Sequence, residues 1–310
     1  MPYSNNIIKK TLLLCTLSLS SLFGYCEMPC TPYVIYCPKG AFSVDAIYWR
    51  AFEGGFEKCY PTSVSDVIAD GHILSTLSGI SHDPHFKWNA GLRAGYEYEV
   101  ADAWDMACSF THFYSRAHHF EDNGSFMRLK LCFDTVDLIA RYKSPCGSCF
   151  ILKPYLGLRG AKINQRVHLL ALPDLTSSTN FVSTEDQNRE KFSGIGPLAG
   201  IEADWDLGKG FGCYANASVS CLYGTFKIRL INSEVFTDSL DFSDEKKHLK
   251  ANLACADAEL GIRYQRPFFL NTFIVVQLGL EHHRYFDYNQ LAQEEDLCFD
   301  GVNFSVGLIF

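Results

Sequence analysis

Hydrophobic and polar residues alternate with a period of two over many short stretches of the chain, which is the pattern of β-strands with two different faces. Residues 301–310, at the C-terminus, alternate without a break. One face of this segment carries Phe304, Val306, Leu308 and Phe310, while the intervening residues are small or polar. A last strand that ends on an aromatic residue is typical of a barrel lying in lipid, so we expect these four residues to form its membrane-insertion strand.

Ten segments with this alternation are predicted to be strands. They cover residues 41–51, 86–100, 103–115, 126–143, 150–163, 193–207, 211–229, 249–265, 272–286 and 301–310. Short connections at 101–102, 144–149, 208–210 and 266–271 alternate with longer ones at 52–85, 116–125, 164–192, 230–248 and 287–300. Outer-membrane barrels sort their connections in this way, with short turns on the periplasmic side. The chain is therefore predicted to be all-β, a transmembrane antiparallel up-and-down β-barrel of about ten strands (about 8–12).

Aromatic residues gather near both ends of these segments, as they do in the two interfacial girdles of a membrane barrel. Those near the short turns are Tyr98, Trp104, Tyr142, Phe150, Trp205, Phe211, Tyr264 and Phe310. Those toward the long loops are Phe86, Trp88, Tyr114, Tyr223 and Tyr285. The alternative is a soluble β-sandwich with an aromatic core, which would alternate equally well but has no reason to sort its loops by length.

The alternation changes parity in two segments. In 126–143 the apolar residues lie at odd positions up to Phe133 and at even positions from Val136 onward. Phe226 and Ile228 likewise depart from the parity of Tyr223. Either a β-bulge or the end of the membrane-spanning part of the strand would produce such a change.

If the apolar faces touch lipid, the opposite faces line the lumen, because an outward Arg or Lys at mid-membrane would cost about 2–4 kcal/mol. The lumen-lining candidates are Lys87, Arg93, Glu97, Asp105, Asp137, Arg141, Lys153, Arg159, Glu202, Asp257, Glu259, Arg263 and Glu281. Their charges are mixed in sign, so they can hydrate a pore, or pair across a narrow barrel and close it. Ten strands enclose a slim interior, so ions and small solutes are the expected cargo.

The N-terminus has the order of a secretory signal peptide. Lys9 and Lys10 precede an apolar run over 11–23, and small residues follow. No later stretch reaches the roughly 18 uninterrupted apolar residues of a membrane-spanning helix. The chain is therefore soluble or crosses a membrane as strands. The predicted parts are a signal peptide over 1–26, a periplasmic segment with Cys and Pro over 27–40, and the barrel over 41–310.

The net charge and the cysteine content limit which binding partners we expect. The formal net charge of −8 becomes −10 when cleavage removes Lys9 and Lys10, which argues against a nucleic-acid partner. Thirteen cysteines, two of them before residue 27, permit disulfides in an exported protein. Lipidation of Cys26 is an alternative that Tyr25 before it disfavours. The disulfide candidates on the periplasmic side are Cys30, Cys37, Cys146 and Cys149.

Three features raise the alternative of catalysis or metal binding. The run Cys146-Gly147-Ser148-Cys149 has redox or zinc spacing, but it lies in a predicted turn with no second pair. Histidines occur in pairs at 118–119 and 282–283 and at His82 and His85, near predicted loops where they are usually solvated. Glu281, His283 and Asp287 at a barrel rim would suit an omptin-like protease, yet no second acidic pair is evident. We therefore predict no enzyme activity, cofactor or metal.

Several phrases resemble a known family. They are FSVDAIYWR (42–50), WDMACSFTHFYS (104–115), DTVDLIARYK (134–143), KPYLGLRGAKINQ (153–165) and, most specifically, GIGPLAGIEADWDLGKGFGCYANASVSCLYGTFKI (194–228). From about residue 42 to the C-terminus the chain resembles the Legionella-type major outer membrane protein family, which includes MOMP-like porins of chlamydiae. The resemblance implies a pore-forming barrel in the outer membrane of a Gram-negative cell. The high cysteine content resembles the disulfide-bonded envelope of chlamydiae.

The expected function is therefore that of a porin-like, narrow water-filled channel for passive diffusion of ions and small solutes. The alternative is a closed structural or adhesive barrel of a disulfide-crosslinked outer membrane. Loops 52–85 and 164–192 are expected to fold inward or to face the host. The expected partners are outer-membrane lipid, the barrel-assembly machinery, and a second copy or disulfide-linked envelope proteins.

Overall fold

The computed structural model describes residues 40–53, 61–69, 72–79, 86–120, 126–147, 149–171, 181–236, 240–269, 272–291 and 295–310. The predicted signal peptide and the segment 27–39 lie outside these residues, as do Cys30, Cys37 and the parts 54–60, 70–71 and 80–85 of the predicted loop 52–85. No helix among the described residues is long and apolar enough to cross a membrane.

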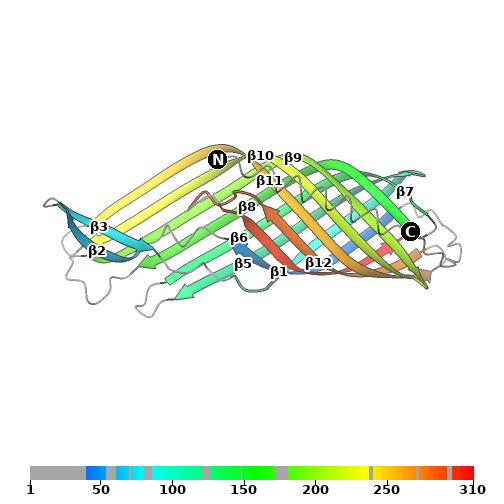
Figure 1. The fold of residues 1–310 in the computed structure, drawn as a ribbon, viewed down its shortest axis with the longest axis horizontal. Coiled ribbons are helices and arrows are strands. Elements are labelled where there is room, and N and C mark those ends of the chain that lie inside the picture. The colour runs from blue at the N-terminus through cyan, green and yellow to red at the C-terminus, as the bar shows by residue number, and fades with distance from the viewer. Residues whose placement is uncertain are drawn as a thin grey trace. The chain divides into compact units, whose positions relative to one another are not determined.

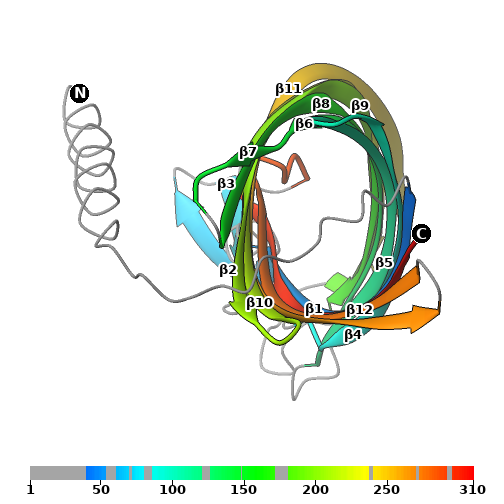
Figure 2. The same cartoon turned by 90° about the vertical axis from the view of Figure 1, so that its right-hand side faces the viewer.

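Ten long antiparallel strands close into one barrel (Figures 1 and 2). They are β1 Gly40–Glu53, β4 Asn89–Ala101, β5 Trp104–Phe120, β6 Phe126–Tyr142, β8 Phe150–Ala171, β9 Phe181–Gly208, β10 Phe211–Phe236, β11 Leu240–Phe269, β12 Thr272–Tyr285 and β13 Leu297–Ile309. Neighbours in sequence pair with each other, and β1 pairs with both β4 and β13 to complete the ring. The predicted all-β, ten-stranded, up-and-down barrel is thus confirmed.

Three shorter strands complete the secondary structure. β7 Ser144–Pro145 pairs with the start of β8, in the predicted short turn. β2 Pro61–Ala69 and β3 His72–Gly79 pair with each other as a separate two-stranded sheet.

The strands extend well beyond the predicted segments on the side of the long loops. β8 and β9 continue through most of 164–192, and β10 and β11 through most of 230–248. The prediction that 164–192 is a loop, folding inward or facing the host, is therefore wrong for 164–171 and 181–192, which are strands. Charged residues alternate with apolar ones in these extensions, a pattern that suits strands standing above the membrane.

The short turn between β9 and β10 has an unusual backbone. Gly208, Lys209 and Gly210 all have positive φ, at 85°, 56° and 84°. Glycine adopts this region without the steric penalty that a Cβ imposes. At Gly210 an added Cβ would also lie 2.2 Å from the carbonyl oxygen of Gln265, so the turn requires glycine there.

The outer face of the barrel is apolar over the membrane-spanning part of each strand. Phe304, Val306, Leu308 and Phe310 of the C-terminal segment are exposed on it, as predicted. Most of the predicted girdle residues are also exposed there, but Phe86 and Tyr285 are buried inside the barrel. Those two assignments to the outer girdle are wrong. Both residues lie toward the long loops, where the apolar residues face the interior instead of lipid.

The parity change in β6 is not a β-bulge. The registers of β6 with β5 and with β8 run without a shift across Asp134 and Thr135. Instead, Leu131 and Phe133 face inward and are buried, whereas Val136 and Leu138 face outward and are exposed. The membrane-spanning part of the strand therefore ends here.

Candidate functional site: the barrel lumen

The lumen has a polar half near the short turns and an apolar half toward the long loops. The polar half contains twelve of the thirteen candidate lumen residues, joined by hydrogen bonds and ion pairs. Lys87 is the exception, because it precedes β4, is exposed, and belongs to neither this network nor the lining of the cavity described below.

Glu281 on β12 is the centre of the first part of this network. Arg93 on β4 reaches across the barrel and donates to both carboxylate oxygens of Glu281, at 2.6 and 3.2 Å. Trp49 Nε1 donates to Glu281 at 2.7 Å, and Asn303 Nδ2 donates at 2.6 Å. A buried carboxylate needs such partners because it is removed from water.

Arg159 on β8 organises a second group. Its guanidinium makes a bidentate pair with Asp137 on β6, at 2.8 Å for each bond, and also binds Asp257 on β11. Asp257 accepts a further bond from Ser218 and lies 2.8 Å from His283 Nδ1. Because β6 and β8 are neighbours and β11 lies across the ring from them, this group ties opposite walls together.

A third group lies nearest the short turns. Arg141 contacts Asp105 at 2.6 Å, Glu97 at 2.5 Å and Glu202 at 2.9 Å. Lys153 contacts the same Glu202 at 2.8 Å. Asp204, on the same strand as Glu202, binds Lys153 at 2.5 Å and Arg263 at 2.6 Å. The Glu97 side chain remains half exposed, so this end of the network meets solvent.

A cavity of about 240 Å³ lies within this polar half. Arg93, Arg159 and Glu259 are among its charged lining residues, and Trp49, Phe133 and Tyr285 are among its aromatic ones. The cavity therefore lies between charged walls and an aromatic cluster.

That cluster fills the other half of the lumen. Its buried members come from every barrel strand except β4, and Phe86 lies three residues before the start of β4, so the cluster spans the full width of the barrel. Phe299 lies at its centre, with ring centroids 4.7 Å from Phe133, 5.6 Å from Phe113 and 5.7 Å from Trp49. We call this set the apolar plug. Its members are Ile47, Trp49, Ala51, Phe86, Phe113, Ala117, Met127, Leu129, Leu131, Phe133, Ala161, Ile163, Val167, Leu169, Phe192, Leu222, Phe226, Ile228, Leu253, Cys255, Tyr285, Tyr288, Leu297 and Phe299.

Sequence reasoning did not predict the apolar plug. The parity changes in β6 and at Phe226 were its signal, since they mark where the apolar residues turn from lipid to the interior. Trp49 stands at the boundary, because its Nε1 binds Glu281 while its rings contact Phe113 and Phe299.

The segment after β12 enters the barrel and covers the plug. Tyr288 and Asn289 are fully buried, and the Tyr288 ring contacts Phe226 at 5.8 Å. The backbone N–H of Gln290 donates to Glu190 on β9 at 3.4 Å. Within the predicted long loop 287–300, Tyr288 and Asn289 thus point inward and 297–300 belong to β13, whereas the sequence predicted an inward fold or a host-facing position only for loops 52–85 and 164–192.

The sequence and the barrel agree with one family. The model of the Legionella pneumophila major outer membrane protein precursor matches residues 36–308. The chain belongs to this family. It is accordingly a β-barrel protein of the outer membrane, as its sequence predicted. No curated protein matches the sequence.

Several solved barrels align with this member of the family. The outer membrane protease OmpT from Escherichia coli covers 91% of this chain and 98% of its own length, at 10% identity and a TM-score of 0.41. The translocator domain of the autotransporter NalP from Neisseria meningitidis covers 99% and 98%, at 9% identity and a TM-score of 0.38. The Ralstonia pickettii toluene transporter TbuX covers 88% and 90%, at 9% identity and a TM-score of 0.36. Similarity this low carries no argument about activity.

The residues considered for omptin-like catalysis do not lie at a rim. Glu281 and His283 point into the lumen on the side of the plug nearer the short turns, and His283 Nε2 is 3.5 Å from Glu281. Asp287 lies beyond the end of β12 and is exposed. The adjacent His282 faces the opposite side of β12, where it pairs with Asp300, so the two histidines cannot share an ion.

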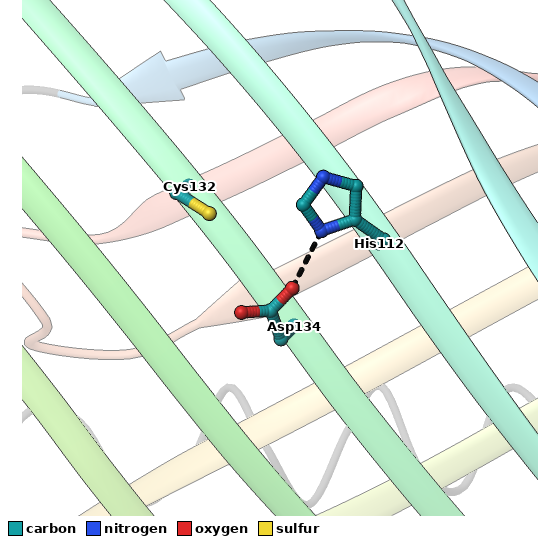
Figure 3. Close-up of side chains that lie close together, drawn as sticks. All are labelled: His112, Cys132 and Asp134. Carbon is teal, nitrogen blue, oxygen red and sulfur yellow. Dashed lines mark hydrogen bonds and ion pairs between the residues drawn. The ribbon is translucent and has the colours of Figure 1, made fainter.

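One group on the outer face has the composition of a metal site. His112 on β5 and Cys132 and Asp134 on β6 have ligand atoms within 4.8 Å of one another (Figure 3). His112 Nδ1 and Asp134 Oδ1 are 2.6 Å apart and satisfy each other by a hydrogen bond. Sequence reasoning missed this group, because only the register of β5 on β6 brings the residues together.

The predicted disulfide residues are only partly described. Cys149 is disulfide-bonded, whereas Cys146 is a free thiol, so the two do not form a local bond with each other. The participation of Cys30 and Cys37 stays a prediction.

Proposed function

We propose that this protein is a narrow channel for ions and small polar solutes, with a charged chamber on the periplasmic side and the apolar plug as its gate. The observation that carries the proposal is the cavity lined by charged side chains in the polar half of the lumen. Burying so many charges is costly, and an apolar interior would serve a purely structural barrel equally well. Hydrophobic constrictions gate other channels by excluding water.

The composition of the chamber favours cations. Carboxylates in the network outnumber its Lys and Arg side chains, which favours cations at a narrow constriction. The carboxylates are Asp45, Glu97, Asp105, Asp137, Glu202, Asp204, Asp257, Glu259 and Glu281, and the basic residues are Arg93, Arg141, Lys153, Arg159 and Arg263.

Reversal potentials in planar bilayers test this channel. Because Glu97 is half exposed, Glu97→Gln should fold and should lower the preference for cations. Arg93→Gln should raise the preference, since it removes a positive charge from the chamber wall. Arg266→Gln, exposed near a short turn and outside the chamber, is the control and should change nothing. A selectivity that neither lumen variant alters would contradict the proposal.

The second candidate is a closed structural or adhesive barrel, and the apolar plug favours it because the plug spans the lumen. Phe299→Ala separates the two candidates, since it removes the ring at the centre of the plug. A channel predicts rare openings in the wild type and frequent ones in the variant. Silence of both in bilayers would favour the closed barrel. That the protein is not an enzyme and takes no cofactor stays a prediction.

A further inference from the structure

Basic side chains form a continuous row on the outer face. The row lies beyond the apolar band, which is the exposed apolar outer face that runs from Phe211 to Tyr223 on β10. The strand registers place each one directly opposite the next, from β5 through β6, β8, β9 and β10 to β11. We call this set the basic row. Its members are Arg116, Lys130, Arg166, Arg189, Arg229 and Lys246.

The basic row points away from the lumen. On β6 the neighbours of Lys130 along the strand, Leu129 and Leu131, are fully buried in the apolar plug. On β8 the neighbours of Arg166, Gln165 and Val167, are likewise buried. Since successive side chains of a strand point to opposite faces, the basic residues between them face outward.

Such a row is unfavourable on its own. Neighbouring strands lie about 4.8 Å apart, and like charges directly opposite each other destabilise a sheet. Across the described residues, Arg116, Lys130, Arg166 and Arg189 take part in no salt bridge, whereas Arg229 pairs with Asp244 at 2.8 Å. The chain as a whole carries a formal charge of −8, so the row is a local concentration of positive charge.

A second line of basic residues lies between the row and the apolar band. Lys191 on β9 is directly opposite Lys227 on β10, again without an acidic partner in the described part of the barrel. Arg189 lowers the pKa of Lys191, and Lys162, Arg166 and Lys227 add to that effect. The positive charges of the basic row and of this second line therefore repel one another.

The position of these residues matches the outer surface of the membrane. On β10 the apolar outer face runs from Phe211 to Tyr223, two exposed aromatic residues. The twelve residue steps from Phe211 to Tyr223 span about 40 Å of strand, or roughly 30 Å of height at a tilt of about 40°. That height matches the hydrocarbon core of a bilayer. Lys227 follows Tyr223 by four residues, so the basic residues begin at the level of lipid headgroups.

We propose that the basic row binds the phosphate groups of a phosphorylated glycolipid in the outer leaflet. Guanidinium groups match phosphate by bidentate, charge-assisted hydrogen bonds, and three consecutive strands carry Lys130, Arg166 and Arg189. An anionic headgroup would also remove the repulsion between opposing side chains. Attachment of acyl chains below the phosphates would place them against the apolar band.

Binding of a diphosphorylated lipid A to the refolded full chain in a neutral detergent tests the proposal. Arg166→Gln/Arg189→Gln removes two central charges of the row. Lys209→Gln/Arg266→Gln removes two exposed charges near the short turns and is the matched control. We expect the row variant to bind at least about tenfold more weakly, since each charge-assisted bond contributes more than a neutral one. The control should bind as the wild type does.

Two further arms identify the ligand. A lipid A analogue without phosphates should bind the wild type and the row variant equally weakly, and inorganic phosphate at the same concentration should not displace diphosphorylated lipid A. Equal binding of both lipids, or displacement by inorganic phosphate, would overturn the proposal. So would an equal loss of binding in the control variant.

Stability provides a readout that is independent of binding. In neutral detergent, the row variant should unfold at a higher temperature than the wild type because repulsion is removed. With diphosphorylated lipid A present, the order should reverse. A variant that is less stable in both media would show a merely structural role for these side chains and would contradict the proposal.

Discussion

The two halves of the lumen are built from opposite chemistry on the same strands. Near the short turns, the inward residues of β13 are Asn303 and Ser305, and the outward ones are Phe304 and Val306. Toward the long loops, the same strand buries Phe299 and Leu297 inside. The half surrounded by lipid is polar within, and the half that stands in water is apolar within.

The difference follows from what lies outside the wall. Where lipid covers the outer face, apolar residues are needed there, and the inward positions can carry charge. Above the membrane the outer face meets water, so the sheet can gain stability by burying apolar residues inside, as in a soluble protein. The apolar plug is thus a hydrophobic core enclosed by the extended ends of the strands.

Removing a ring from the apolar plug should change stability most. Phe299→Ala should lower the free energy of unfolding by about 3–5 kcal/mol, because Phe299 is fully buried among other rings. Phe304→Ala, on the same strand but facing lipid, should cost much less, because lipid replaces the lost contacts. Urea unfolding in lipid vesicles measures both. Equal losses of unfolding free energy in the two variants would show that the plug half of the lumen is not a packed core distinct from the lipid-facing surface.

The next effect contrasts two outward positions on β9. Ile201 lies near the middle of the apolar band, so Ile201→Arg should lower the free energy of unfolding by about 2–4 kcal/mol. An Arg near the membrane interface costs only about 0–1 kcal/mol. Gln187→Arg, exposed beyond the band and beside Glu185, should leave stability nearly unchanged. If both substitutions were tolerated equally, β9 would not pass from lipid to water between these residues.

A smaller effect depends on pH. Burial and the nearby Glu53 raise the pKa of Glu190, which lies on β9 beyond the membrane-spanning part, beside the segment that covers the plug. A carboxyl whose pKa is higher in the folded state binds more protons there, so folding loses stability as pH rises above the unfolded value of 4.5. Urea midpoints should therefore be lower at pH 8 than at pH 5.

Glu190→Gln is the matched variant for this effect. It should remove much of the pH dependence and stabilise the barrel at pH 8 by about 1–3 kcal/mol, the cost of a buried group without full compensation. A variant that keeps the pH dependence of the wild type would assign the effect to another group.

Much of the fold could be predicted from the sequence. Strict alternation over 301–310 and the sorting of turn lengths identified a membrane barrel, because period two and short turns are local properties. The lumen positions of Arg93 and Arg159 followed from the same parity. Which carboxylate each binds could not be predicted, since Glu281 and Asp257 reach them from distant strands.

The apolar plug was beyond sequence reasoning for a different reason. An inward apolar residue such as Leu129 and an outward one such as Leu138 look the same in the sequence, and only the end of the membrane distinguishes them. The burial of Tyr288 depends on the path of an irregular segment, for which alternation gives no information.

The accessibility of Cys255 shows whether a hydrophobic core closes the lumen. This free thiol is buried in the plug, whereas Cys146 is a free, exposed thiol near the short turns. A small charged thiol reagent, with labelling followed peptide by peptide in detergent, should modify Cys146 rapidly and Cys255 at least about a hundredfold more slowly, as expected for burial in a packed interior. In Phe299→Ala the rate at Cys255 should rise, and in urea both thiols should react. Similar rates at Cys255 and Cys146 in the folded wild type would mean that water fills the outer half of the lumen, which would contradict this account.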